Sequence, residues 1–134
     1  MEMWKEVFKG RIPKDIYEIS LQNGEMGGLI INLISKKYYV NMDFGVVSAI
    51  RMLDEGIVLN ELFKDESIGE FRKQKFENII YQIVDGEFGG FIRKIGGDLC
   101  NCLRMKHYIV ITLNYVVEII TEWEPDISVI EKII

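Results

Sequence analysis

The sequence has few of the residues on which most enzymes and secreted domains depend. Its 134 residues include one histidine, two cysteines and two prolines, and its longest apolar stretch, at residues 108–120, is interrupted by polar side chains. A membrane-spanning helix needs about 18 or more consecutive apolar residues, so we expect no membrane contact. Residues 1–10 mix charged and apolar side chains, and we therefore expect no secretion signal.

The cysteines indicate where the protein works. Cys100 and Cys102 lie two residues apart, too close for the kind of disulfide that stabilises secreted domains. A reduced, cytoplasmic setting is therefore expected. The hydrophobic fraction of 49% and the charged fraction of 28% are typical of a globular chain, and the length fits a single domain over residues 1–134.

His107 and the two cysteines are the residues that first suggest a metal site or a nucleophile. A structural zinc site needs four ligands, usually with wider cysteine spacing, and a Cys102–His107 pair would meet only across a sharp turn. The paired glycines do not form a phosphate-binding motif between a strand and a helix. We therefore predict no catalytic residues, no metal and no cofactor, and we expect that the protein is not an enzyme.

Charge is unevenly distributed along the chain. The net charge is −5, but residues 54–70 sum to −5 and residues 107–134 to −4, whereas residues 1–53 and 71–106 sum to +1 and +3. Acidic surfaces repel phosphate backbones and attract basic proteins. We expect no binding to nucleic acid, because the short basic stretch at 72–75 is flanked by glutamates and is typical of a solvated face.

Hydrophobic periodicity predicts an α+β fold, with an antiparallel sheet and a few short helices. Strands are expected at 16–21, 29–35 and 38–44, with two more within 99–123 joined by a bend at 106–107 or 114–115. Short helices are expected at 43–56 and 126–134, and a surface loop at 64–70. Residues 76–83 fit either a helix or a strand.

A possible internal repeat bears on that choice. Residues 23–30 and 85–92 share Gly-Glu-x-Gly-Gly at an offset of 62 residues. If the copies are structurally equivalent, both are strand, tight glycine turn and strand, which favours a strand before residue 85. Glu25 and Glu87 would then occupy equivalent turns, where they either share a site or simply face water. Coincidence also explains the match, because glycine turns recur independently.

The remaining candidates are surface residues for a protein partner. Carboxylates with a large aromatic residue form the usual mixture of an interface anchor and its charged rim. Trp123 is either such an anchor or a core residue. The predicted partner-binding residues are Asp54, Glu55, Glu61, Asp65, Glu66, Glu70, Glu122, Trp123, Glu124 and Asp126.

This small, acidic chain, rich in isoleucine, lysine and asparagine, resembles the immunity proteins of bacterial polymorphic-toxin systems, including contact-dependent growth inhibition. The resemblance is one of type and implies a tight complex with a cognate toxin domain, often a basic nuclease, whose active site the acidic surface would cover. Two alternatives stay open: a small-molecule or regulatory module built on the two glycine turns, and a homo-oligomeric structural protein. The sequence leaves the oligomeric state open.

Overall fold

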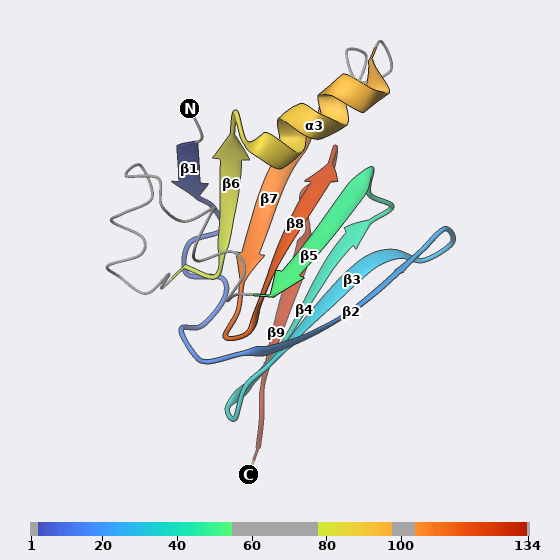
Figure 1. The fold of residues 1–134 in the computed structure, drawn as a ribbon. Coiled ribbons are helices and arrows are strands. Elements are labelled where there is room, and N and C mark those ends of the chain that lie inside the picture. The colour runs from blue at the N-terminus through green and yellow to red at the C-terminus, as the bar shows by residue number, and fades with distance from the viewer. Residues whose placement is uncertain (1–2, 55–77, 98–103, 134) are drawn as a thin grey trace.

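The computed structural model describes residues 3–54, 78–97 and 104–133, which form two antiparallel sheets and one helix (Figure 1). The elements in chain order are β1 (Met3–Glu6), β2 (Glu18–Gly24), β3 (Gly28–Ile34), β4 (Tyr38–Gly45), β5 (Ala49–Asp54), β6 (Ile80–Val84), α3 (Glu87–Gly96), β7 (Lys106–Ile111), β8 (Tyr115–Thr121) and β9 (Asp126–Glu131). Within these ranges, no helix has the length and apolar character needed to cross a membrane.

The larger sheet has the strand order β1-β6-β7-β8-β5, and the smaller sheet has the order β2-β3-β4-β9. Every neighbouring pair is antiparallel. The predicted α+β class, an antiparallel sheet with short helical structure, is therefore confirmed. The strands divide into two sheets, which the sequence did not indicate.

The main core lies between the two sheets. Strands of the smaller sheet contribute residues such as Ile31, Leu33 and Met42, and strands of the larger sheet contribute residues such as Val110 and Val117, all fully buried. Alternate residues of a strand point to opposite faces, so each strand gives the core every second side chain. Burial of these β-branched and aliphatic side chains is the main force that holds the sheets together.

The opposite face of the larger sheet carries a second cluster that includes Trp4, Tyr81, Ile109 and Val116. Helix α3 lies across one end of this sheet, beside the tops of β6, β7 and β8 (Figure 1). Phe88 is the buried residue that α3 contributes. The larger sheet therefore has apolar side chains on both faces, which explains the nearly continuous apolar sequence of β7 and β8.

Both predicted helices are wrong. The segment 43–56 contains the end of β4 and the whole of β5, which pairs with β8 from Ala49 to Asp54. The tail forms β9, which pairs with β4, and the spacing of Ile127 and Ile130 places the first in the core and leaves the second exposed. In both cases a strand partner distant in sequence outweighs a short helical pattern.

The two copies of the glycine repeat have different structures, so the predicted equivalence is wrong. The first copy is a hairpin turn in which Gly28 has a φ of +69° and a Cβ would lie 2.2 Å from the backbone of Gly45. The second copy follows β6 and opens α3, in which Gly90 donates its N–H to the Gly86 carbonyl. Identical glycines thus serve close strand approach in one copy and helix packing in the other.

Several other strand predictions are confirmed. The hairpin with lysines at its tip joins β3 to β4, and the ambiguous segment overlaps β6, so it is a strand there. The long apolar run does form two paired strands, β7 and β8, but the bend lies at 112–114. The predicted bend at 106–107 is therefore wrong, because these residues belong to β7, and the alternative at 114–115 is displaced toward β8. The predicted loop at 64–70 lies outside the described residues.

Two buried tyrosines make the fold sensitive to alkali. Burial raises the pKa of Tyr17 and of Tyr108 to about 12. The folded state therefore favours the neutral form of each phenol, whose pKa in the unfolded chain is about 10. The stability that comes from burying the neutral phenols is complete below about pH 10 and is lost as the pH rises toward about 12.

We therefore expect cooperative unfolding between about pH 10 and 12, followed by circular dichroism together with tyrosinate absorbance. Tyr108→Phe should shift the transition to higher pH, whereas Tyr115→Phe, at an exposed position, should leave it unchanged. Equal shifts in the two variants would contradict the assignment.

Candidate functional site

Two chain crossings between the sheets meet at one corner of the molecule. Residues 46–48 lead from β4 to β5, and residues 122–125 lead from β8 to β9. The indole Nε1 of Trp123 donates to the Val46 carbonyl at 3.2 Å, and the Ser48 amide donates to the Ile120 carbonyl at 2.8 Å. These bonds hold the two crossings against one another. We call Asp43, Glu122, Trp123, Glu124 and Asp126 the acidic corner.

Trp123 is exposed at this corner, so the core alternative for it is wrong. The side chain keeps 56% of its surface exposed, and Val46, which its indole contacts, keeps 58%. A large aromatic residue that is fixed by a backbone hydrogen bond yet open to solvent loses little conformational entropy when a partner covers it. This is the geometry of an interface anchor.

The carboxylates of the corner are crowded. Asp43 on β4 lies directly opposite Asp126 on β9, and both are exposed. Opposed side chains on antiparallel strands lie on the same face with Cβ atoms about 5 Å apart, and like charges there are destabilising. Asp43 accepts a hydrogen bond from the Gly45 amide at 2.9 Å, but no described cation forms an ion pair with Asp43 or Asp126.

A single ion pair reaches the corner among the described residues. Lys106 Nζ lies 3.6 Å from Glu124 Oε1, and the side chains keep 36% and 65% of their surface exposed. A surface pair of this length contributes little stability of its own. Arg11 also comes near, because its guanidinium donates to the carbonyl of Ile127, the residue after Asp126, at 3.2 Å. Four carboxylates against these two cations leave the corner with a net negative charge.

Asp54, the described residue of the other predicted contact region, lies away from this corner. Asp54 ends β5 opposite Tyr115, whereas the corner lies at the other end of the β5–β8 pair, where Ala49 faces Ile120. Five residues of extended strand separate the two ends by about 17 Å. The other candidates of that region lie outside the described residues: Glu55, Glu61, Asp65, Glu66 and Glu70.

A buried polar cluster of Arg51, His107 and Glu118 lies on the helix-covered face of the larger sheet. The register of β7, β8 and β5 brings these three strands side by side. Glu118 Oε1 lies 2.9 Å from His107 Nε2, and Oε2 accepts from Arg51 Nε at 2.7 Å and also contacts Arg51 Nη2. Each carboxylate oxygen thus has its own partner, which a buried charge requires.

Helix α3 closes over this cluster. The Phe88 ring lies 5.9 Å from the His107 ring, and the Arg51 guanidinium lies 4.7 Å from the Phe88 ring centre. A carboxylate only accepts hydrogen bonds, so Nε2 donates in this contact and the second ring nitrogen is Nδ1. That atom is buried and has no hydrogen-bond partner within the described ranges.

Glycines of the second repeat copy make room for the imidazole. A Cβ on Gly86 would lie 2.6 Å from Ile83 Cγ2 and 2.9 Å from His107, and a Cβ on Gly89 would lie 3.3 Å from His107 Nδ1. Gly90, by contrast, faces open space. The motif therefore fixes how closely the start of α3 approaches His107.

Alanine substitution separates these roles. Gly86→Ala is expected to lower the free energy of unfolding by about 1–3 kcal/mol, because the new methyl group collides with buried side chains. Gly90→Ala should raise it by about 0.5–1 kcal/mol, because alanine favours a helix where space is free. Urea unfolding of both variants measures the difference. A Gly86→Ala variant as stable as wild type would show that the contact relaxes without cost.

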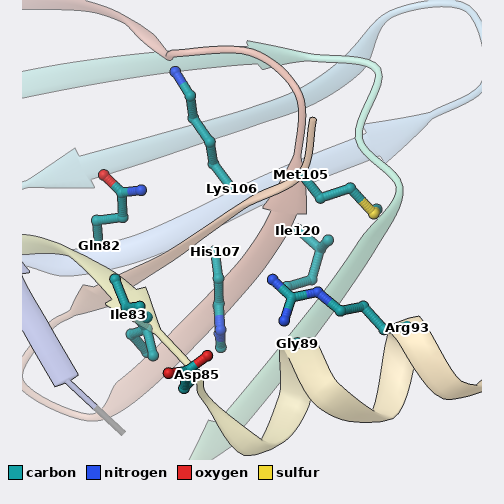
Figure 2. Close-up of a pocket in the computed structure, with 10 residues that line it drawn as sticks. Gln82, Ile83, Asp85, Gly89, Arg93, Met105, Lys106, His107 and Ile120 are labelled. Atoms are coloured by element: carbon teal, nitrogen blue, oxygen red, sulfur yellow. The ribbon is translucent and has the colours of Figure 1, made fainter. Parts of the chain in front are cut away.

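A cavity of about 190 Å³ opens beside the buried polar cluster (Figure 2). We call it the β6–α3 cavity, because it lies where β6 turns into the helix and β7 begins. Its lining combines the largely buried Ile83, Met105, His107 and Ile120 with the polar Gln82 and the charged Asp85, Arg93 and Lys106. Sequence reasoning missed this site, because its residues come from four elements, β6, α3, β7 and β8, that no motif connects.

The structure bears on the shared glutamate site, the cysteine–histidine pair and the metal site that the sequence suggested. Glu25 lies in the turn between β2 and β3, far across the molecule from Glu87 at the start of α3, so the two glutamates share no site (Figure 1). His107 is bonded to Glu118, and Cys100 and Cys102 lie outside the described residues. Among the residues that are described, no three His, Cys, Asp or Glu side chains gather as metal ligands.

Comparisons of the chain with protein-family models, with curated proteins and with solved structures found no match.

Proposed function

We propose that this protein binds and neutralises a basic partner protein, in the manner of an immunity protein that blocks a toxin domain such as a nuclease. The protein works in the cytoplasm, without catalysis, and its acidic surface covers the active site of the partner. Binding to nucleic acid or to a membrane has no part in this function.

The observation that carries the proposal is the exposed Trp123 within the acidic corner. Trp123 supplies apolar area, and Asp43, Glu124 and Asp126 supply negative charge around it. The repulsion between Asp43 and Asp126 destabilises the free protein. A lysine or arginine of the partner placed beside the two carboxylates would remove this repulsion, which favours the complex. The described residues therefore favour the acidic corner, rather than Asp54, as the contact surface.

Charge reversal at the corner tests this function. A variant with Glu122, Glu124 and Asp126 all changed to Lys should lose the partner that the wild-type protein retains from a lysate of its native cells. The matched control changes Glu6, Glu18 and Glu131 to Lys, which alters the net charge equally at positions away from the corner.

The proposal predicts a stoichiometric basic partner that is captured by wild type and control but not by the corner variant. The association rate of the corner variant should fall at least about 10-fold at low salt, and the difference should shrink as salt rises. Equal capture by the corner variant and the control would overturn the proposal.

A further inference from the structure

The β6–α3 cavity holds unpaired charges of both signs at its rim. Asp85 and Arg93 are exposed and line the same cavity, yet neither forms an ion pair with the other or with another residue in the described ranges. Lys106, the third charged group, is already engaged by Glu124. A cation and an anion that face one cavity without contacting each other leave both charges available to a ligand.

The backbone holds these groups in place. Asp85 has a φ of +57°, a left-handed conformation that is uncommon outside glycine and that marks the sharp turn from β6 into α3. Arg93 extends from α3 one turn beyond Gly89, toward the start of β7. Figure 2 shows the His107 ring with the Asp85 carboxylate below it and the Arg93 guanidinium beside it.

The floor of the cavity adds one unpartnered polar atom to an apolar surface. His107, Ile83 and Ile120 are more than nine-tenths buried, and the His107 Nδ1 atom has no partner among the described residues. Glu118 holds the imidazole by Nε2, and Nδ1 lies on the side of Gly86 and Gly89. An apolar floor with a few convergent polar groups is the usual composition of a small-molecule site.

We propose that the β6–α3 cavity binds a small zwitterion, of the class of free amino acids. The carboxylate of the ligand pairs with the Arg93 guanidinium, and its ammonium group donates to the Asp85 carboxylate. A volume of about 190 Å³ lies below the roughly 300–1,000 Å³ of sites for drug-sized ligands, so the ligand has only a few heavy atoms. This binding is separate from the partner contact at the acidic corner.

The test is an NMR titration of the ¹⁵N-labelled full chain with glycine, L-alanine, acetate and methylammonium at constant pH and ionic strength. The zwitterions should give saturable shifts at the Gly89 and His107 amides with a Kd of about 10 mM or below. Acetate and methylammonium, which each carry one of the two charges, should bind at least about 10-fold more weakly, because each leaves one rim charge unpaired.

Variants complete the test. Arg93→Gln and Asp85→Asn should each weaken zwitterion binding at least about 10-fold, and asparagine tolerates the left-handed backbone of position 85. Lys94→Gln, next to Arg93 but outside the cavity lining, should bind like wild type. Acetate or methylammonium binding as tightly as the zwitterions, or no saturable shift with any probe, would overturn the proposal.

Discussion

Glu118→Leu is expected to lower the free energy of unfolding by about 3 kcal/mol, because it removes the carboxylate that pairs with both Arg51 and His107. The cost of breaking a buried ion pair is usually about 3–5 kcal/mol. The lower value applies because the Arg51 side chain keeps 26% of its surface exposed and regains water. In a chain of this size the melting temperature should fall by about 10 °C, measured by thermal denaturation.

Two variants control this result. Glu18→Leu replaces an exposed glutamate on a strand and should change stability by no more than about 0.5 kcal/mol. The triple variant Arg51→Met/His107→Phe/Glu118→Leu should recover much of the loss, since an apolar replacement of all three members leaves no buried polar group without its partner. A Glu118→Leu variant within about 1 kcal/mol of wild type would contradict the structural role of the buried polar cluster.

Trp123→Ala should weaken the complex with the basic partner by about 30- to 1,000-fold, which corresponds to about 2–4 kcal/mol for an aromatic hot spot. Most of the loss should appear in the dissociation rate, because the indole supplies contact area rather than long-range attraction. Surface plasmon resonance with the captured partner separates the two rates.

The matched control for Trp123→Ala is Leu113→Ala. Leu113 is 52% exposed, close to the 56% of Trp123, but it lies in the turn between β7 and β8, at the end of β8 opposite the corner. Its truncation should leave the Kd unchanged, and circular dichroism should show that both variants are folded. Equal losses of affinity for the two variants would remove Trp123 from the interface.

Local patterns in the sequence predict those strands whose partners are near in the chain. The lysine pair at 36–37 marks a hairpin because its flanking runs alternate and pair directly. Strands β5 and β9 were predicted as helices because their partners, β8 and β4, lie far away in sequence and no local signal reports them. The glycine repeat suggested two equivalent turns for a related reason, since the structure at each glycine depends on tertiary contacts that the local sequence does not report.

The candidate sites follow the same rule. The residues of the acidic corner between 122 and 126 were predictable, because charge and aromatic content are properties of one short segment. Asp43 was not, because its opposition to Asp126 is a tertiary register. Glu118 is conspicuous in an apolar strand, but its place near His107 follows from a bend at 112–114 that was predicted at 106–107 or 114–115, and Arg51 lay in a supposed helix. The buried cluster therefore required the structure.

The most direct test of the proposed function is the growth of cells that produce the captured partner together with this protein. We expect that the partner alone stops growth, that the wild-type chain and the Glu6/Glu18/Glu131→Lys control restore it, and that the Glu122/Glu124/Asp126→Lys variant does not, although it is folded and equally abundant. Full protection by that corner variant would contradict the assignment of the acidic corner as the inhibitory surface.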